Sequence, residues 1–447
     1  MKLNLTIAKI AKITGGTLQS ENPETNITAF VTDSRFVTPG DGFIALKGER
    51  FDAREFIPDV LKKGAALVIA EKGYLGDTPK ENSFLWVKDP KKALQALAKY
   101  HRQHHNLKVV AITGSNGKST TKQMLRSICS VAGTTVANVG NLNNQYGVPF
   151  SLLEIQPKHK YGVFELGASH PGDIEETASL ALPDVAVITN VGPSHLEFFH
   201  DLQTVYKTKI EIARSLRAGG TLVYNIDNEF LARLEKEFTG KSISFGFGPN
   251  AQLRLLETEN FAFTYQGKAQ VFDLKLERHD KYNAAAACAA AIALGIGMDE
   301  IKEGLAAFTP MPMRMERTTK GNTHFILDCY NANPASMKNA IEILGRAKEL
   351  PRVAVLGDMK ELGKTSKEYH RQVARQLLDN HITHIFLAGP EMKYCYERLQ
   401  DVTGLYLWYG ETPKEWMGDL KKLLAQGGTC LIKASHSMNF ETIFKEI

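Results

Sequence analysis

The chain of 447 residues lacks the cysteine patterns that mark disulfide-bonded or zinc-binding proteins. No CxxC pair and no cysteine–histidine cluster occurs. The five cysteines are odd in number and scattered: Cys129, Cys288, Cys329, Cys395 and Cys430. Because structural disulfides persist in oxidising compartments, we expect a reduced, cytoplasmic location.

Long hydrophobic runs are also missing. The most apolar stretch, AAAACAAAIALGIG at 284–297, is rich in alanine and too short to span a bilayer. The N-terminal segment interrupts its apolar residues with Lys9 and Lys12, unlike a signal peptide. We therefore expect no membrane insertion and predict that 284–297 is a helix packed closely inside a domain.

No block of charge of one sign is present. The net charge of +5 comes from 54 basic and 49 acidic residues, which suits anionic small molecules and does not favour nucleic acid. The composition, 43% apolar and 23% charged, is that of an ordinary soluble globular protein. The length exceeds what one hydrophobic core covers and suggests about three domains.

Short β-branched runs that alternate with helical stretches predict an α/β fold in three domains, at 1–85, 86–312 and 313–447. In the central domain, runs such as KVVAITG and VAVITNVG end in glycine or asparagine before helical stretches. This pattern predicts a mostly parallel sheet of the P-loop type with helices on both faces. A small α/β domain precedes it, and a Rossmann-like α/β domain follows a predicted hinge at Pro310 and Pro312.

The sharpest local pattern is KVVAITGSNGKSTTKQML at 108–125, which predicts a strand, a glycine loop and a helix. Such a loop binds phosphate through converging backbone N–H groups, with Lys118 on the terminal phosphates and Ser119 on Mg²⁺. The general pattern has glycine where this chain has Ile112, so a chance glycine turn before a helix is the alternative. The dipeptide Asn-Lys is absent, which excludes a guanine-reading N-K-x-D motif. The loop alone leaves a motor, a kinase or a ligase open.

Three further residues lie at or after predicted strand ends, where ligands bind in open α/β sheets. Glu165 ends one strand, His195 follows another, and Lys209 lies on the apolar stripe of a helix predicted at 201–216. Each has an ordinary alternative: an exposed carboxylate, a hydrogen-bonded loop histidine and a lysine that snorkels to the surface. A buried Lys209 would favour its neutral amine, which can take up CO₂ as a carbamate and, beside Glu165 and His195, hold a second Mg²⁺.

At these residues the chain resembles the Mur ligase family. TGSNGKST matches the family's T-G-[ST]-x-G-K-[ST]-[ST] loop, which dispenses with the first glycine and so accounts for Ile112. NVGPSHLE followed by TKIEI is similar to the segment with the family's metal-binding histidine and carbamylated lysine, and ELGASH to that with its metal-binding glutamate. The resemblance covers about residues 30–440, through these further stretches: TDSR, FIALKGERFDAREF, GNLNNQYGVP, HDKYNAAAACAAA, MRME, ILDCYNANPASM and VLGDMKELG.

The resemblance implies an ATP-dependent amide ligase of cell-wall precursor synthesis in the cytoplasm. Its substrates would be UDP-N-acetylmuramoyl-tripeptide and D-alanyl-D-alanine, joined through an acyl phosphate. The implied cofactors are ATP, two Mg²⁺ ions and CO₂ as a lysine carbamate, and we expect a monomer. Two alternatives stay open: a folylpolyglutamate-type ligase and a non-catalytic nucleotide-binding module.

The same resemblance implies roles for individual residues. The catalytic set is Lys118, His195 and Lys209, and the metal ligands are Ser119, Glu165, His195 and Lys209. The ATP-binding set is Gly114, Ser115, Asn116, Gly117, Lys118, Ser119, Thr120, Asn283, Arg314 and Asp328. The substrate-binding set is Ser34, Arg35, Asn141, Asn143, Asn144, Asp358 and Glu361.

Three positions depart from the family pattern. Arg54 replaces a histidine, Asp280 replaces an asparagine, and KASHSM at 433–438 replaces KGSRSM, so that His436 stands in the place of an arginine. If that arginine binds a carboxylate in the family, His436 would bind it weakly at neutral pH.

Overall fold

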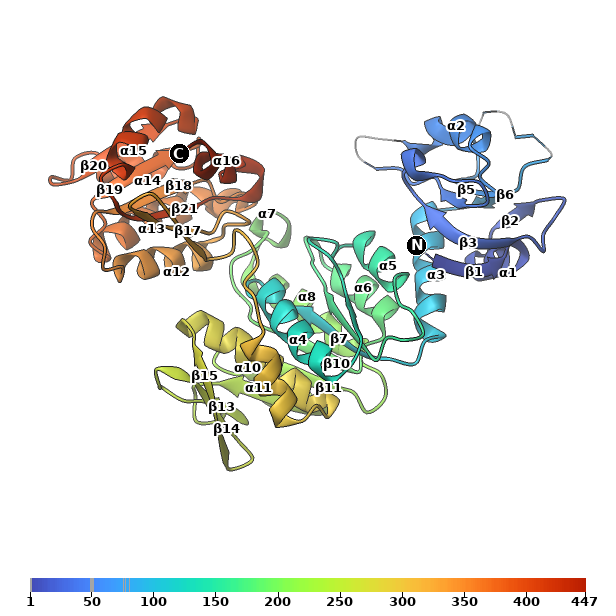
Figure 1. The fold of residues 1–447 in the computed structure, drawn as a ribbon, viewed down its shortest axis with the longest axis horizontal. Coiled ribbons are helices and arrows are strands. Elements are labelled where there is room, and N and C mark those ends of the chain that lie inside the picture. The colour runs from blue at the N-terminus through green and yellow to red at the C-terminus, as the bar shows by residue number, and fades with distance from the viewer. Residues whose placement is uncertain (1, 49–51, 75, 77, 80) are drawn as a thin grey trace.

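The computed structural model describes residues 2–48, 52–74, 76, 78–79 and 81–447. Its strands form three sheets that follow one another along the chain (Figure 1). In this view the N-terminal and C-terminal units lie at opposite ends of the central unit (Figure 1). The predicted α/β class with three sheet-containing units is confirmed.

The N-terminal sheet has the strand order β1-β3-β4-β5-β6-β2. The pairs from β3 to β6 are parallel, and β1 and β2 add antiparallel edges. Its strands are β1 (Lys2–Thr6), β2 (Thr17–Gln19), β3 (Asn26–Val31), β4 (Gly42–Ile44), β5 (Leu67–Glu71) and β6 (Phe84–Val87). Its helices are α1 (Ile7–Thr14), α2 (Ile57–Lys62) and the connecting α3 (Pro90–Gln103).

The central sheet has the order β15-β14-β13-β12-β11-β10-β7-β9-β8, and its strand pairs are parallel except for the two antiparallel pairs that β14 makes with β13 and β15 near one edge. The strands are β7 (Lys108–Thr113), β8 (Thr135–Ala137), β9 (Tyr161–Glu165), β10 (Val185–Ile188), β11 (Thr221–Asn225), β12 (Lys241–Gly246), β13 (Leu253–Leu255), β14 (Asn260–Tyr265) and β15 (Lys268–Lys275). The helices are α4 (Lys118–Ala132), α5 (Gly147–Leu152), α6 (Asp173–Ala181), α7 (Leu196–Phe199), α8 (Leu202–Arg214), α9 (Leu234–Glu237), α10 (Arg278–Leu294) and α11 (Met298–Ala306).

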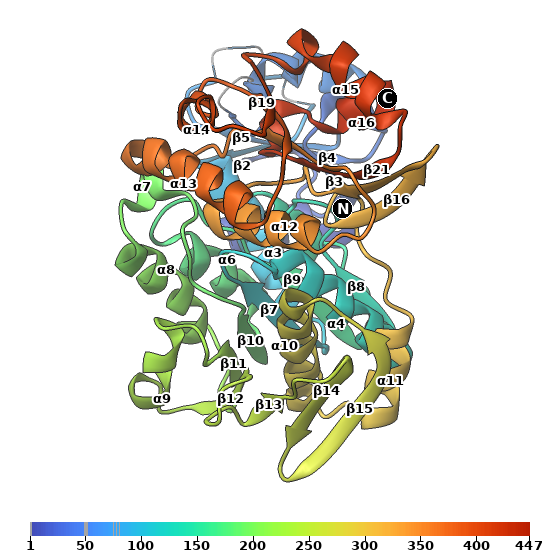
Figure 2. The ribbon, with the colours of Figure 1, turned by 90° about the vertical axis from the view of Figure 1, so that its left-hand side faces the viewer.

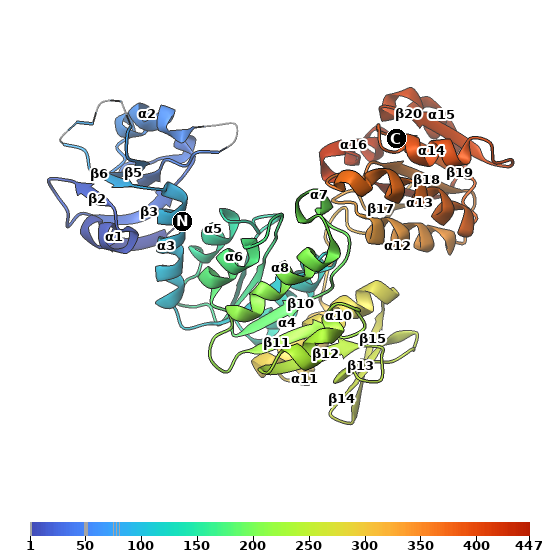
Figure 3. The ribbon, with the colours of Figure 1, turned by 180° about the vertical axis from the view of Figure 1, so that it is seen from behind.

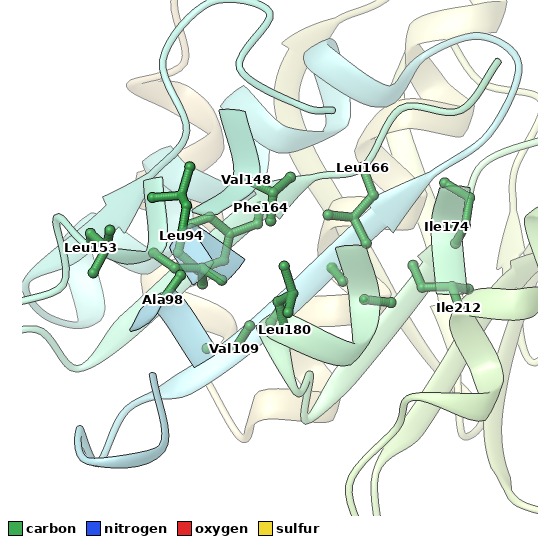
Figure 4. Packing of buried hydrophobic residues seen from close by; sticks show 14 of the residues in the cluster. Leu94, Ala98, Val109, Val148, Leu153, Phe164, Leu166, Ile174, Leu180 and Ile212 are labelled. Carbon is green, nitrogen blue, oxygen red and sulfur yellow. The ribbon is translucent and has the colours of Figure 1, made fainter. Parts of the chain in front are cut away.

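Helices cover both faces of the central sheet because alternate strand residues point to opposite sides. Val109 packs in one hydrophobic cluster with residues of α3, α5, α6 and α8 (Figure 4). Val110 and Ile112 pack in another cluster with residues of α4, α10 and α11. The predicted helix at 284–297 corresponds to α10, whose run of small alanines is fully buried against this second face.

The C-terminal sheet has the order β16-β17-β21-β18-β19-β20, parallel except for β16. Its strands are β16 (Glu316–Lys320), β17 (Thr323–Leu327), β18 (Arg352–Gly357), β19 (His384–Ala388), β20 (Tyr406–Gly410) and β21 (Gly428–Lys433). Its helices are α12 (Pro334–Gly345), α13 (Ser366–Asp379), α14 (Lys393–Leu399), α15 (Met417–Leu424) and α16 (Glu441–Glu446).

Each change from one sheet to the next occurs close to a predicted domain boundary. Strand β6 runs to Val87, and α3 then packs its Leu94 and Leu97 in one cluster with Ile7 of α1 and with residues of the central unit. The change from α11 to β16 falls between 307 and 315, around the predicted proline hinge. The division at 85 and 312 stays a proposal. Within the described residues, no helix combines the length and apolar character that crossing a bilayer requires.

Candidate functional site

The phosphate loop joins β7 to α4 and depends on two glycines. Gly114 has φ 145° and Gly117 has φ 79°, backbone conformations that favour glycine. A Cβ on Gly114 would lie 1.9 Å from Thr189 Oγ1. The backbone N–H of Asn116 donates to Asn190 Oδ1 at 2.8 Å, which fixes the loop against the end of β10. The loop is therefore held in one shape by its neighbours.

Helix α4 begins at Lys118 directly after this loop. Gly117, at the N-cap, has no side chain to bond the first turn, so the backbone N–H groups there remain donors for an anion. The Lys118 Nζ donates to Gly114 O at 2.7 Å, and desolvation lowers the pKa of this lysine. The geometry is that of a phosphate-binding loop.

Glu165, at the end of β9, lies beside the first turn of α4. It is 2% exposed, and its two carboxylate oxygens have different partners. Ser119 Oγ donates to Oε2 at 2.7 Å, and Asn143 Nδ2 donates to Oε1 at 2.8 Å. Burial alone would raise the pKa of Glu165, but the ammonium groups of Lys118 and Lys122 outweigh it and hold this pKa below its usual value. The carboxylate is therefore charged at neutral pH.

Ser119 and Glu165 fit a magnesium ion by their chemistry. Both offer oxygen atoms, which Mg²⁺ prefers, and the two oxygens converge at one point. Within the part of the chain that the structure describes, no three His, Cys, Asp or Glu side chains are arranged to hold a metal. Mg²⁺ commonly keeps waters and takes substrate phosphates, so two protein oxygens beside a phosphate loop are sufficient.

His195 lies at the start of α7 with φ 50° and is turned toward the C-terminal unit. Its Nδ1 lies 2.5 Å from Glu361 Oε2, and this contact holds the pKa of Glu361 below its usual value. The backbone N–H of Glu197 also donates to Glu361 O at 3.0 Å. Helix α7 lies beside the C-terminal unit (Figure 2, Figure 3). In this arrangement His195 contacts an acid of the other unit rather than Glu165.

Lys209 lies on α8, which spans most of the predicted helix at 201–216. Its side chain is 1% exposed, so the snorkelling alternative is wrong, and its Nζ lies 5.7 Å from the centroid of the Phe199 ring. Burial, reinforced by the charge of Lys118, lowers the pKa of Lys209 to about 7. A substantial fraction of this amine is therefore neutral at neutral pH, which is the form that reacts with CO₂.

The C-terminal unit contacts the phosphate loop directly. Arg314 donates to Ser119 Oγ at 2.9 Å, and its guanidinium carbon lies 4.1 Å from the centroid of the Tyr330 ring. Asn333, the N-cap of α12, donates through Nδ2 to Asn116 Oδ1 at 2.7 Å. A cavity of about 970 Å³ lies where these two units meet.

Most of the predicted site residues line this cavity. They are Ser115, Asn116, Gly117, Lys118, Ser119, Thr120, Asn141, Asn143, Asn144, Glu165, His195, Asn283, Arg314, Asp328 and Glu361. The predicted residues outside its lining are Ser34, Arg35, Gly114, Lys209 and Asp358.

The residues outside the lining have identifiable surroundings. The carbonyl of Gly114 accepts the hydrogen bond from Lys118 Nζ. Ser34 and Arg35 belong to the N-terminal unit, where Arg35 pairs with Asp33. Asp358 is fully buried and accepts a hydrogen bond from the backbone N–H of Met392 at 2.9 Å. The structure does not bring Asp358 to the cavity, because its carboxylate is used inside the C-terminal unit.

Sequence reasoning missed several polar residues of the site. Lys122 lies 3.5 Å from Glu165 Oε2 and is 2% exposed. Its spacing of four residues from Lys118 on one helix was a usable signal, since such residues share a face. Asn333 lies in ILDCYNANPASM and Lys433, which pairs with Asp328, lies in KASHSM. Nothing in the sequence marked either residue individually as part of the site.

The three departures from the family pattern each have a partner in the structure. Arg54 pairs with Asp52, which is two residues away. Asp280 Oδ1 accepts a hydrogen bond from Asn283 Nδ2 at 3.2 Å. His436 lines the cavity and stacks on Tyr330, with 5.4 Å between the ring centroids.

Known proteins are similar to this chain in each of its three units. Three family models match: "Mur ligase family, catalytic domain" at 26–102, "Mur ligase middle domain" at 112–291 and "Mur ligase, glutamate ligase domain" at 313–436. The chain is 36% identical over 402 residues to the UDP-N-acetylmuramoyl-tripeptide--D-alanyl-D-alanine ligase of Escherichia coli (strain K12), covering 87% of each protein. The chain belongs to the Mur ligase family.

Solved structures agree with this membership. A crystal structure of MurF from Acinetobacter baumannii matches with a TM-score of 0.92 and 33% identity, over 100% of this chain and 99% of that one. The MurF ligase of Thermotoga maritima in complex with ADP matches with a TM-score of 0.84 and 30% identity, over 93% and 96%. The likeness therefore includes all three units of this Mur ligase chain.

The packing around Gly114 leads to a first prediction. We expect Gly114→Ala to weaken ATP binding by at least about tenfold, because the added Cβ would overlap Thr189 Oγ1 and disturb the loop. Gly192→Ala is the matched control, since a Cβ there would meet its nearest atom only at 4.0 Å. Isothermal titration calorimetry measures the dissociation constant of ATP for both variants and for the parent chain. Equal affinity of Gly114→Ala and the parent chain would contradict the structure of the loop.

Proposed function

We propose that the chain is an ATP-dependent amide ligase that joins D-alanyl-D-alanine to UDP-N-acetylmuramoyl-tripeptide through an acyl phosphate. The observation that carries the proposal is the contact of the C-terminal unit with the phosphate loop, through Arg314 on Ser119 and Asn333 on Asn116. Binding a nucleotide needs the loop alone, whereas a reaction between two substrates needs the second unit beside the terminal phosphate. The UDP-N-acetylmuramoyl-tripeptide--D-alanyl-D-alanine ligase of Escherichia coli, at 36% identity, supports the same activity.

The residues of the cavity would act mainly by position and charge, as is typical of phosphoryl transfer. The tripeptide carboxylate attacks the γ-phosphorus, the bond to ADP breaks, and an acyl phosphate forms. The amine of D-alanyl-D-alanine then attacks the acyl carbon, and inorganic phosphate leaves. Lys118 and Arg314 would neutralise charge on the phosphate oxygens. Contact between the two units would exclude water that could otherwise hydrolyse the acyl phosphate.

Ser119 and Glu165 would hold the first Mg²⁺, which supplies neutralising charge to the phosphate oxygens when bound. For the second ion we propose His195 and a carbamate on Lys209, supported by the burial of this amine and its lowered pKa. The contact of His195 Nδ1 with Glu361 leaves Nε2 of the same ring as the nitrogen that would bind the metal, with the carboxylate orienting the ring.

The remaining predicted residues divide among the three units. Ser34 and Arg35 would bind the uridine end, and the loop that carries Asn141, Asn143 and Asn144 would contact the peptide of the first substrate. Asp358 and Glu361 would serve the unit that receives the dipeptide, with Asp358 acting only through its neighbours. We further propose a cytoplasmic monomer without a nucleic-acid partner. The five free, buried cysteines support only the cytoplasmic location.

Both alternatives rank lower. A folylpolyglutamate-type ligase has no use for a uridine-binding N-terminal unit, yet residues 26–102 match a Mur ligase family model. A non-catalytic nucleotide-binding module has no use for a buried Lys209 beside a charged phosphate site. Neither alternative is favoured by a contact in the cavity.

The proposed function predicts that phosphate release from ATP requires both substrates. We would measure release with UDP-N-acetylmuramoyl-tripeptide and D-alanyl-D-alanine, each alone and together, and follow the pentapeptide product by mass spectrometry. Product formed in step with phosphate is the expected result. Release that ignores the dipeptide but responds to folate and glutamate would overturn the proposal in favour of the other ligase. No release with either pair would leave nucleotide binding alone.

A carbamate on Lys209 predicts a specific rescue. We expect Lys209→Ala to lose at least about a hundredfold in kcat, with partial recovery on adding short carboxylic acids that replace the missing anion. Lys207→Ala is the matched control, since Lys207 is an exposed lysine on the same helix. Carbon NMR with ¹³CO₂ should show a carbamate signal in the parent and the control but not in Lys209→Ala. An identical spectrum for Lys209→Ala would contradict the assignment.

A further inference from the structure

Helix α4 carries two lysines, one turn apart, near the Glu165 carboxylate. Lys118 begins the helix and folds over the phosphate loop, whereas Lys122 points to the interior and is 2% exposed. A buried ammonium group is costly unless it is paired and hydrogen-bonded. The partners of Lys122 therefore indicate what this charge does.

Lys122 has partners on two different segments. Its Nζ lies 3.5 Å from Glu165 Oε2 and donates to Asn138 O at 3.1 Å and to Gly140 O at 3.4 Å. These carbonyls belong to the root of the loop at 138–144, which follows β8. One ammonium group thus connects the phosphate helix, the carboxylate beside it and this loop.

The loop root is also fastened to β9. Asn138 Nδ2 donates to Glu165 O and to Leu142 O, both at 2.9 Å, and Asn138 Oδ1 accepts from Glu165 N at 3.0 Å. Between Asn138 and Asn143, which itself donates to Glu165 Oε1, the loop is open: Val139 is 76% exposed and Leu142 is 39% exposed. The loop needs an anchor, because its exposed tip contributes little packing of its own.

When a nucleotide is bound, Lys118 and Lys122 would have different partners. A bound phosphate would take the charge of Lys118, whose Nζ already lies over the phosphate loop, and Lys122 would remain the buried cation beside this carboxylate. The same cation holds the carbonyls of the loop. The position of Glu165 and the position of the loop are therefore tied to one charge.

We propose that Lys122 is a positioning residue that couples the loop at 138–144 to the phosphate site. Lys122 fixes the loop root to α4 and Glu165, so that Asn141, Asn143 and Asn144 face the cavity in one arrangement. The inference rests on the proposed function only in assigning this loop to the UDP-linked substrate. Lys122 is not among the residues that line the cavity, so we assign it no contact with the nucleotide or the reacting atoms.

Hydrogen exchange of the free chain tests the anchor without any substrate. We expect Lys122→Met to accelerate amide exchange at 138–146 by about tenfold or more, with little change in β7 and in the C-terminal sheet. Arg126→Met is the matched control, one turn further along α4 at an exposed position. Parent-like exchange of the loop in Lys122→Met would overturn the proposal, as would equal acceleration across the whole chain.

A double variant separates the anchor from an unpaired charge. Lys122→Met leaves Glu165 without its buried partner and can fail to fold, whereas Lys122→Met with Glu165→Gln leaves no unpaired charge. The proposal requires fast exchange of the loop in the double variant too, because the bonds to Asn138 O and Gly140 O are lost there. Parent-like exchange in the double variant would overturn it.

Steady-state kinetics supply the second readout. Lys122→Met should raise the KM for the UDP-linked substrate by about tenfold and the KM for ATP by clearly less, because the backbone of the phosphate loop and Lys118 still bind the phosphates; general destabilisation does not produce this split. Equal changes in both KM values would overturn the coupling. If the parent shows no ligation at all, the proposed function fails, and the exchange experiment still decides the role of Lys122.

Discussion

The buried carboxylate of Glu165 is the group on which the rest of the site depends. It lies at the end of β9, next to the strand that carries the phosphate loop, and it is charged although it is almost fully enclosed. A charge in such a place has to be compensated. The compensation brings Ser119, Lys122 and Asn143 to one point, and these residues come from the phosphate helix and from the neighbouring loop.

The same need for compensation extends to the third unit. Arg314 reaches Ser119, so the C-terminal unit adds a cation beside the carboxylate at the mouth of the phosphate loop. On the other side, Glu361 contacts His195 and supplies an acid to the central unit. The C-terminal unit thus places a cation near Glu165 and an acid beside His195. The two sides of the cavity are therefore complementary before any substrate enters.

Much of the fold could be predicted because its signals are local. The run from Lys108 to Leu125 contains strand, loop and helix in order, and the lysine at 209 interrupts an apolar stripe that the structure places inside the protein. The contacts between units could not be predicted this way. Asn333 on Asn116 and Glu361 on His195 join residues more than a hundred positions apart, and no periodicity in one sequence encodes such pairs. Lys122 lay between these cases, since its helix face was predictable and its partners were not.

Binding of ATP with and without Mg²⁺ tests the central role of Glu165 most directly. In the parent chain, Mg²⁺ should strengthen ATP binding by about tenfold or more, because Ser119 and Glu165 hold the ion against the phosphates. Glu165→Gln keeps the shape of the side chain and removes its charge, so it should bind ATP equally well with and without Mg²⁺. The same gain from Mg²⁺ in Glu165→Gln as in the parent would contradict the account.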